Sequence, residues 1–381
     1  MTPSLFSPLA LGPVRLPNRI AVSPMCQYSA ADGCMTDWHL QHLMTMAMSG
    51  AGLVVVEATG VERIGRITHG CTGLYSDDNE RAMARVLAAA RSVALPGTRF
   101  GIQLAHAGRK ASARRPWEGG TPLRADDDPW QTVAPSPIAL DDGWPVPAGL
   151  DEAGIERIRL AFVDAARRAV RLGFEVIELH MAHGYLLHAF QSPLANRRDD
   201  RWGGDRDRRL AFPLAVARAV RDAVPKEIAV GARITGSDWM DGGLEGEDAV
   251  ALAAALKTIG FTHVCVSSGG ISLKARIPLG PGYQVPFAAK VKAETGIVTR
   301  SVGLIADPHQ ANDIIEKGQA DFVALARGLL DNPRWPWHAA EALGADLPRP
   351  PQYERAKPAL WPGAKIARPD AETAPRVARV G

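Results

Sequence analysis

The segment GIERIRLAFVDAARRAVRLGFEVIELHMAHGY, residues 154 to 185, combines the two patterns that decide the fold. From Ile155 to Ala169, apolar residues recur at spacings of three and four with arginines between them, which is typical of an amphipathic helix. Gly173 then stands where a helix C-cap is expected. The run VIELH (176–180) is typical of a strand that is buried on both faces. A helix that leads into such a strand is the unit from which parallel sheets are built.

The same unit recurs along the chain. An open, doubly wound sheet would also alternate in this way, but no GxGxxG follows any of the strand-like runs and no GxxxxGK[ST] occurs. Eight βα units over about 300 residues match a (β/α)₈ TIM barrel, which is the α/β fold that we expect. The eight runs are IAVSP (20–24), LVVVE (53–57), FGIQLA (100–105), VIELH (176–180), IAVGARI (228–234), HVCVSS (263–268), IVTRSV (297–302) and FVALA (322–326).

One segment interrupts the alternation after the third strand. Residues 108–150 are rich in Pro, Gly, Asp and Trp and show no periodicity. A loop of this length is usually a functional lid or is disordered, and its tryptophans favour an ordered cap over the barrel mouth. We therefore expect one domain over residues 1–355 with a capping insertion at about 108–150. We expect a C-terminal tail over 356–381 that is flexible or lies at a subunit interface.

The composition excludes several classes of protein. The chain has 381 residues, 46% hydrophobic and 22% charged, with a net charge of +3, so nothing suggests a nucleic-acid or membrane partner. No apolar run approaches the roughly 20 residues that span a bilayer, and the N-terminus lacks the basic leader of a signal peptide. The four cysteines show no CxxC spacing, which argues against a disulfide framework. We expect a cytoplasmic protein with reduced thiols.

Polar and reactive residues gather where the expected strands end. In an α/β barrel the active site forms at the carboxyl ends of the strands, because the loops that follow all of them meet there. These ends are therefore where we expect the chemistry. In chain order they read SPMCQY, EATG, QLAHAGRK, HMAHGY, ARITGSD, SSGG, SVG and LARG.

The HMAHGY segment admits three interpretations. A metal-dependent barrel hydrolase would use His180 and His183 as zinc ligands, but it needs further ligands, and no HExxH or cysteine-rich motif accompanies the pair. A pair of structural histidines is the commonest reading of an isolated HxxH. Because this pair directly follows a buried strand, we favour a polar cradle for a substrate oxygen or anion, with Tyr185 as the proton donor.

Other strand ends are suited to a large, flat, polar cofactor. Gln103 carries an amide that both donates and accepts, as a pyrimidine edge requires. Arg233 could stabilise an anionic ring, although an arginine at a strand end is more often part of a structural ion pair. Gly303 and Arg327 follow the seventh and eighth strands, where barrels commonly bind phosphate. A polar ring at one end and a phosphate at the other describe FMN. Cys26 is either an inert buried thiol or a group that tunes a redox ring.

Long strings of the sequence resemble one family closely, the old yellow enzymes, which are flavin-dependent ene-reductases on a (β/α)₈ barrel. The resemblance runs from Phe6 to about Arg355. Cys26, Tyr28 and the ending QYER (352–355) resemble the bacterial subgroup with a flavin-tuning cysteine. The strings are LPNRIAVSPMCQYSAADG, DWHLQH, GAGLVVVEATGV, QLAHAGRKA, ELHMAHGYLLHAFQSPLANRRDDRWGG and LARGLL.

The resemblance implies a cofactor, a reductant and a substrate class. FMN would be the cofactor and NADPH or NADH the hydride donor, in a ping-pong reduction of activated alkenes such as enones and maleimides, with nitro compounds and other xenobiotics as further acceptors. Lys110 would lie near the ring edge. The residues that would contact FMN are Ser23, Pro24, Met25, Cys26, Ala58, Gln103, Arg233, Gly303, Ala326 and Arg327.

The resemblance also assigns roles on the substrate side. His180 and His183 would donate to the carbonyl or nitro oxygen, Tyr185 would protonate the α-carbon, and Tyr28 would help to hold the ligand. Arg355 would reach into the site of a neighbouring subunit, which implies a homodimer or a homotetramer. The physiological substrate and the choice between NADPH and NADH stay open.

Two features qualify the resemblance. Val302 stands where some close relatives carry a tryptophan, which would widen the pocket near the flavin. Relatives with an added iron–sulfur cluster need a cysteine-rich motif after the barrel, and no cysteine follows Cys265.

Overall fold

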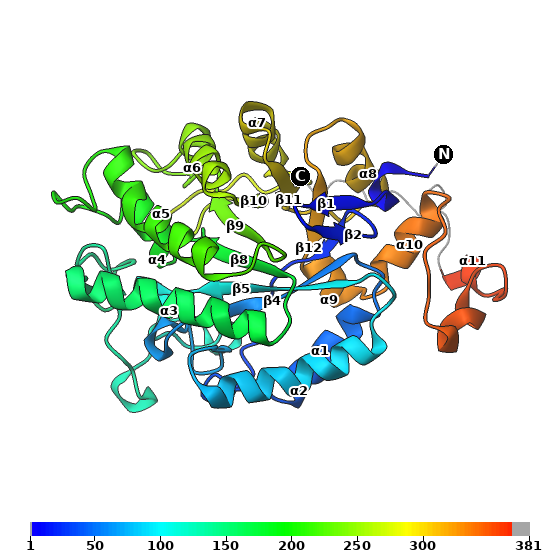
Figure 1. Cartoon of the computed structure of the whole chain (residues 1–381), viewed down its shortest axis with the longest axis horizontal. Coiled ribbons are helices and arrows are strands. Elements are labelled where there is room, and N and C mark those ends of the chain that lie inside the picture. Colours follow the sequence, from blue (N-terminus) through cyan, green and yellow to red (C-terminus); the bar gives the residue numbers. More distant parts are fainter. Residues whose placement is uncertain (1, 368–381) are drawn as a thin grey trace, which may run out of the picture.

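Eight parallel strands close into a barrel in this computed structural model, which describes residues 2–367 (Figure 1). Each of the eight strand-like runs of the sequence forms one of them, so the predicted (β/α)₈ fold is confirmed. Because neighbouring strands are parallel throughout, their carboxyl ends all meet at one end of the barrel. The strands are β3 (Ile20–Val22), β4 (Leu53–Gly60), β5 (Arg99–Ala105), β8 (Val176–Met181), β9 (Ala229–Thr235), β10 (His263–Ser267), β11 (Val298–Ser301) and β12 (Phe322–Leu325).

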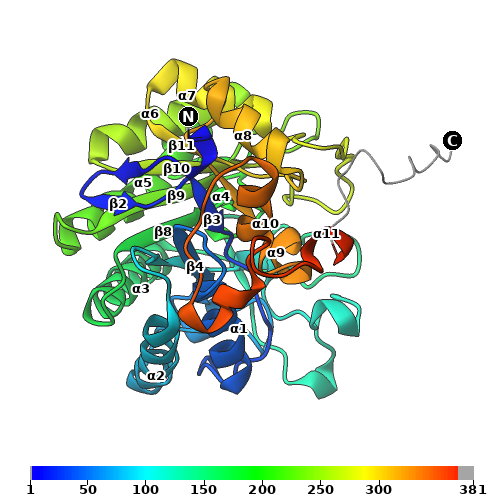
Figure 2. The ribbon, with the colours of Figure 1, turned by 90° about the vertical axis from the view of Figure 1, so that its right-hand side faces the viewer.

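Helices surround the barrel and pack their apolar faces on it (Figures 1 and 2). They are α1 (Asp37–Ala47), α2 (Asp77–Val93), α3 (Glu152–Arg171), α4 (Leu186–Gln191), α5 (Arg206–Ala223), α6 (Gly246–Ile259), α7 (Val285–Thr295), α8 (Pro308–Glu316), α9 (Arg327–Asp331) and α10 (Trp335–Ala342). A last short helix, α11 (Ala364–Ala367), belongs to the C-terminal segment.

Helix α3 shows how the sequence sets the ends of these elements. The side chain of Asp151 accepts a hydrogen bond from the Gly154 N–H and so caps the first turn. Ile155, Ile158 and Phe162 lie on the buried face. Gly173 follows the helix with φ +77°, a left-handed conformation that glycine adopts without strain. The chain then enters β8, in which every residue is buried.

A short N-terminal hairpin closes the amino end of the barrel. Strands β1 (Leu9–Leu11) and β2 (Val14–Leu16) are antiparallel. Leu11 and Leu16 are fully buried, and they pack in one cluster with Ala21, Leu53 and Val176, which come from the barrel strands. The apolar hairpin therefore fills this end, and the polar strand ends lie at the other.

The insertion between β5 and α3 holds five short elements, namely η3 (Gly108–Lys110), η4 (Pro116–Glu118), η5 (Ala125–Asp127), β6 (Val133–Ala134) and β7 (Ala148–Gly149). The buried guanidinium of Arg109 donates to the Ile271 carbonyl at 2.7 Å, in the loop after β10. The Trp130 indole donates to the Ile64 carbonyl at 2.9 Å, in the loop after β4. The insertion thus contacts two loops at the carboxyl end of the barrel. The division of the chain into one domain and a tail stays a prediction.

The C-terminal segment packs beside α10 (Figure 2). Tyr353, in η6 (Pro351–Ala356), meets Trp337 edge to face with ring centroids 6.2 Å apart. Of the tail predicted over 356–381, residues 368–381 lie outside the described part of the chain. Over residues 2–367, none of the helices combines the length and the apolar character that crossing a membrane requires.

Candidate active site

A cavity of about 270 Å³ opens at the carboxyl end of the barrel. It lies against the ends of β3, β9, β10, β11 and β12, and polar side chains and loop backbone form much of its wall. Six of the site residues expected from the sequence line it: Ser23, His183, Arg233, Gly303, Ala326 and Arg327.

His180 and His183 form a hydrogen-bonded pair at the end of β8. The Ala182 N–H donates to His180 Nδ1 at 3.2 Å, which leaves the ring proton of His180 on Nε2. His180 Nε2 lies 3.3 Å from His183 Nδ1, and His183 Nε2 lies 2.7 Å from the Ser267 hydroxyl. These contacts are satisfied when His180 donates to His183 and His183 donates to Ser267.

Both histidines are uncharged at neutral pH. Burial lowers the pKa of each ring well below its usual value of 6.5, and the positive charge of Arg233 lowers it further. Each ring therefore offers one N–H donor and one lone pair. Across residues 2–367 no three His, Cys, Asp or Glu side chains are grouped so that they could hold a metal ion.

The backbone after His180 is unusual and is held from two sides. His183 has φ +59° and Gly184 has φ +75°, so two successive residues are left-handed. A Cβ on Gly184 would lie 2.2 Å from the Gly270 carbonyl oxygen, and the position therefore requires glycine. From the insertion side, the Lys110 ammonium donates to the His183 and Gly270 carbonyls, both at 2.9 Å.

Tyr185 lies beside the histidine pair. Its ring centroid is 4.7 Å from that of His180, and the Lys110 ammonium is 5.3 Å from the ring centre. Burial raises the pKa of Tyr185 well above its usual value of 10, so the phenol keeps its proton at neutral pH. Tyr185 also lines a small neighbouring cavity together with Ala58, Ile67 and other residues.

Lys110 makes the pH dependence of stability testable. Burial, with a contribution from Arg109, lowers the pKa of Lys110 from 10.5 to about 8. Between these two values the unfolded chain binds more protons than the folded one, so the free energy of unfolding rises with pH. Relative to Lys110→Met, the wild type should gain about 1–2 kcal/mol from pH 8 to pH 10, measured by urea unfolding. Lys317→Met, at an exposed surface pair, is the control. Parallel curves for wild type and Lys110→Met would contradict the assignment.

Gln103 is oriented by a buried ion pair. Its Nε2 donates to Glu178 Oε1 at 2.7 Å, and the other oxygen of Glu178 pairs with Arg300. Both charged side chains are fully buried. Because the amide nitrogen faces Glu178, the carbonyl oxygen of Gln103 is the atom left to accept from a bound group.

Cys26 and Tyr28 follow β3 in the loop at the carboxyl end of the barrel. Burial, with the neighbouring Cys71 and Glu57, raises the pKa of the Cys26 thiol well above its usual value of 9. Cys26 is thus a neutral thiol at pH 7. The Tyr28 ring meets Trp117 of the insertion edge to face at 5.9 Å, and the Tyr28 carbonyl accepts from Arg115 Nε at 2.9 Å.

Comparison with known proteins decides which family this site belongs to. Residues 4–346 match the family described as NADH:flavin oxidoreductase / NADH oxidase. The chain is a member of that family, the old yellow enzymes. It is 42% identical to an NADPH dehydrogenase of Geobacillus thermodenitrificans over 357 residues, which cover 93% of this chain and 99% of the relative. It is 40% identical to an NADPH dehydrogenase of Listeria innocua over 354 residues, 92% of this chain and 98% of the relative.

Solved structures agree with this membership. Morphinone reductase superposes with a TM-score of 0.74 at 27% identity, covering 92% of this chain and 93% of its own. A 2-naphthoyl-CoA reductase superposes with a TM-score of 0.80 at 21% identity, which shows the fold alone, and this chain spans 53% of it. This old yellow enzyme is therefore an FMN-dependent oxidoreductase that takes hydride from a nicotinamide donor.

The residues of this old yellow enzyme fit FMN. Arg233 Nε is a buried donor without a hydrogen-bond partner among residues 2–367, next to the cavity. Gln103 presents an acceptor whose orientation is set from behind. A ring that carries both an acceptor and an N–H on its polar edge satisfies both groups, as the pyrimidine part of a flavin does.

Three other residues expected at the site differ in their exposure and in their distance from the cavities. Pro24 and Met25 are partly exposed between Ser23 and Cys26. Arg355 lies exposed in η6 and lines neither of the two cavities at the site.

Sequence reasoning missed several side chains. Ser267 and Ser268 belong to the SSGG segment at the carboxyl end of a strand. Their position therefore indicated the site, although their residue type suggested no role. Tyr283 and Gln284 line the cavity from the loop before α7. They lie far along the chain from the end of β10, so their position in the sequence does not indicate that they belong to the site.

Proposed function

We propose that this old yellow enzyme is an ene-reductase for activated alkenes, namely α,β-unsaturated carbonyl compounds and maleimides, with nitro compounds and other xenobiotics as further acceptors. One observation carries the proposal: two neutral histidines whose facing nitrogens are 3.3 Å apart, beside a tyrosine that keeps its proton. Donors to an oxygen, next to an acid, are what the reduction of a conjugated carbonyl requires.

FMN would be held from both ends of the cavity. Gln103 and Arg233 would bind the polar edge of the ring, while residues 23–26 and Ala58 would line its faces. Gly303, Ala326 and Arg327, which border the cavity after β11 and β12, would hold the phosphate. When bound, FMN would supply the hydride chemistry, with NADPH or NADH as the donor and the alkene as the acceptor.

The substrate oxygen would lie between His180 and His183 and accept from both. This requires His183 to carry its proton on Nδ1, and Ser267 allows it, because a hydroxyl can donate as well as accept. When Ser267 donates to His183 Nε2, His183 can carry its proton on Nδ1 and His180 its proton on Nε2, so both rings can donate to one oxygen. Gln284 Oε1 then loses the hydrogen bond that it accepts from the Ser267 hydroxyl at 2.9 Å, but it keeps the one from the Ser268 hydroxyl at 3.0 Å.

Hydrogen bonds from these two rings would strengthen as negative charge develops on the oxygen. Interactions that are stronger in the transition state than in the ground state lower the barrier. Tyr185 would then deliver its proton to the α-carbon, and Tyr28 would hold the ligand from the side of the insertion. A neutral Cys26 would lie at the flavin as a thiol and tune its potential.

Tyr185→Phe tests the acid. We expect the variant to slow the reduction of 2-cyclohexenone by about 10²- to 10⁴-fold, the usual contribution of a general acid. Reduction of the bound flavin by NADPH should change little, because that half-reaction protonates no carbon. Stopped-flow absorbance separates the two half-reactions. Tyr75→Phe is the matched control, since its hydroxyl donates to the Asp32 carbonyl outside the site.

Two outcomes would contradict the proposal at different levels. If Tyr185→Phe reduces 2-cyclohexenone at the wild-type rate, another group is the acid. If the wild-type enzyme oxidises NADPH but reduces neither 2-cyclohexenone nor N-phenylmaleimide, the substrate class itself is wrong.

We further propose a homodimer or a homotetramer in which Arg355 contributes to a neighbouring site. Supporting this, Arg355 is exposed and has no ion-pair partner in the part of the chain that the structure describes. The edge-to-face contact of Tyr353 with Trp337 holds the segment that carries Arg355 against α10.

A further inference from the structure

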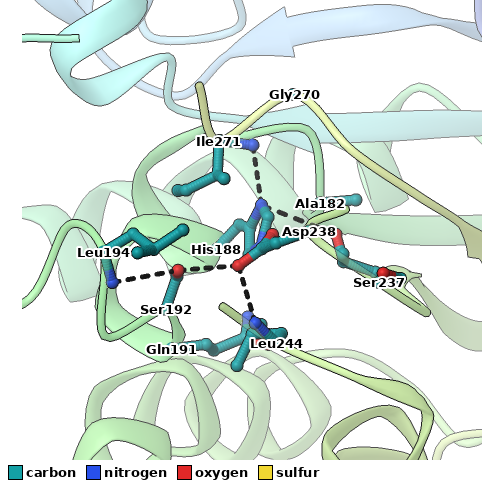
Figure 3. A network of polar contacts seen from close by, with 12 residues as sticks. Ala182, His188, Gln191, Ser192, Leu194, Ser237, Asp238, Leu244, Gly270 and Ile271 are labelled. Carbon is teal, nitrogen blue, oxygen red and sulfur yellow. Dashed lines mark hydrogen bonds and ion pairs between the residues drawn. The ribbon is translucent and has the colours of Figure 1, made fainter. Parts of the chain in front are cut away.

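We infer that His188 and Asp238, which face each other in a polar network (Figure 3), are positioning residues. Their pair fixes the Gly184 peptide and thereby aims His183 and Tyr185. The inference rests on the proposed function, because it assigns this network to the geometry of the oxygen cradle. Neither side chain lines the cavity, so both act through the segment 182–185.

The contacts form a continuous path from α4 and the loop after β9 to the cradle. The Gly184 N–H donates to His188 Nδ1 at 2.7 Å. His188 Nε2 lies 3.0 Å from Asp238 Oδ1, and both side chains are fully buried. Asp238 Oδ2 accepts from the Ser192 hydroxyl at 2.7 Å and from the Leu244 N–H at 2.9 Å.

These contacts allow one arrangement of protons. Because Gly184 donates to Nδ1, the ring proton of His188 is on Nε2, the nitrogen that lies 3.0 Å from Asp238 Oδ1. Burial would raise the pKa of Asp238, but His188, the Leu244 N–H and the Ser192 hydroxyl lower it below its usual value. Asp238 is therefore a carboxylate that accepts from the Ser192 hydroxyl and the Leu244 N–H and lies against His188 Nε2, and its charge favours the His188 tautomer that accepts from Gly184.

The segment needs this support because its conformation is disfavoured. His183 has φ +59°, which a non-glycine residue rarely adopts, and such conformations persist where surrounding contacts over-determine them. Lys110 holds the His183 carbonyl on one side of the Gly184 peptide, and His188 holds the N–H on the other. Gly184 is followed directly by Tyr185, so one peptide sets the direction of both functional side chains.

Asp238→Asn tests the inference with almost no change of shape. The Leu244 N–H can only donate, so the new amide must keep its oxygen there and turn its NH₂ toward His188. His188 would then carry its proton on Nδ1, facing the Gly184 N–H, and that peptide would lose its acceptor. We expect the dissociation constant of 4-hydroxybenzaldehyde, followed by its charge-transfer band with the flavin, to rise about 10- to 100-fold. FMN content should be unchanged.

A second readout separates positioning from a general loss of structure. In ¹⁵N-histidine spectra of the holoenzyme, His188 should change from the Nε2–H to the Nδ1–H tautomer in Asp238→Asn. Ser192→Ala removes one hydrogen bond from the same carboxylate but leaves the tautomer in place, so it should bind the phenol like the wild type.

The double variant His188→Asn/Asp238→Asn covers the case in which the single variant folds poorly. The amide oxygen of an asparagine occupies about the position of His Nδ1, so the Gly184 N–H regains an acceptor and no charge is buried. We expect it to bind 4-hydroxybenzaldehyde more tightly than Asp238→Asn.

Three outcomes would overturn the inference: wild-type phenol affinity in Asp238→Asn, an unchanged His188 tautomer, or a double variant as weak as the single one. A wild-type enzyme that shows no charge-transfer band would instead contradict the proposed cradle, which distinguishes the two failures.

Discussion

Replacing His180 and His183 together by alanine should lower kcat/KM for 2-cyclohexenone by about 10⁴-fold. Removing one donor to a developing oxyanion typically costs about 10²- to 10³-fold, and two donors that act on one oxygen are not fully additive. The loss should fall mostly on alkene reduction, because charge develops on the substrate oxygen in that step. Steady-state kinetics at saturating NADPH measure it.

A phenol titration shows whether the loss comes from the cradle. A phenolate mimics the developing enolate, so 4-hydroxybenzaldehyde should give a long-wavelength band with the wild-type flavin and none with the double variant. His309→Ala, at an exposed position of α8, controls for the loss of a histidine elsewhere. A double variant that binds FMN and keeps the band would show that the pair does not hold the oxygen.

Glu178→Gln should give the largest loss of stability that we expect from a single substitution. The change leaves the Arg300 guanidinium fully buried without its counter-charge. Breaking a buried ion pair by removing one partner typically costs about 3–5 kcal/mol, because the remaining charge stays desolvated. Urea unfolding of the holoenzyme in excess FMN measures the free energy of unfolding.

Two further variants make the cause specific. Glu178→Gln/Arg300→Met removes both charges and should recover much of the loss, since apolar replacement of a buried pair is often neutral. Glu156→Gln breaks an exposed pair with Arg159 and should cost less than about 1 kcal/mol. If Glu178→Gln is as stable as Glu156→Gln, leaving Arg300 buried without its counter-charge does not lower the free energy of unfolding, and the prediction is wrong.

The same substitution bears on the cofactor. Glu178 accepts from the Gln103 amide and so decides which end of that amide faces the cavity. A glutamine at 178 can satisfy Gln103 in either orientation, so the affinity for FMN should fall in parallel with the stability.

The barrel could be predicted from the sequence because burial on both faces makes parallel strands continuously apolar. This is why all eight runs, from IAVSP to FVALA, correspond to strands of the barrel. The region of the site could be predicted for a related reason: the carboxyl ends of parallel strands must meet, so the polar residues that follow each strand had to gather at one end. Seven of the eight strand ends were given a candidate residue on this ground or on the family resemblance.

The connections among those residues depended on the tertiary structure. Glu178 pairs with Arg300 across 122 positions, and His183 meets Ser267 across 84. Such contacts depend on the register of the closed barrel and on side-chain direction, and neither leaves a periodic signal in the chain. The left-handed backbone at His183 is likewise invisible in the sequence, because contacts from Lys110 and His188 impose it. The sequence by itself determined the barrel and which strand ends carry polar groups, whereas folding decided which groups touch, which protons they hold and where they point.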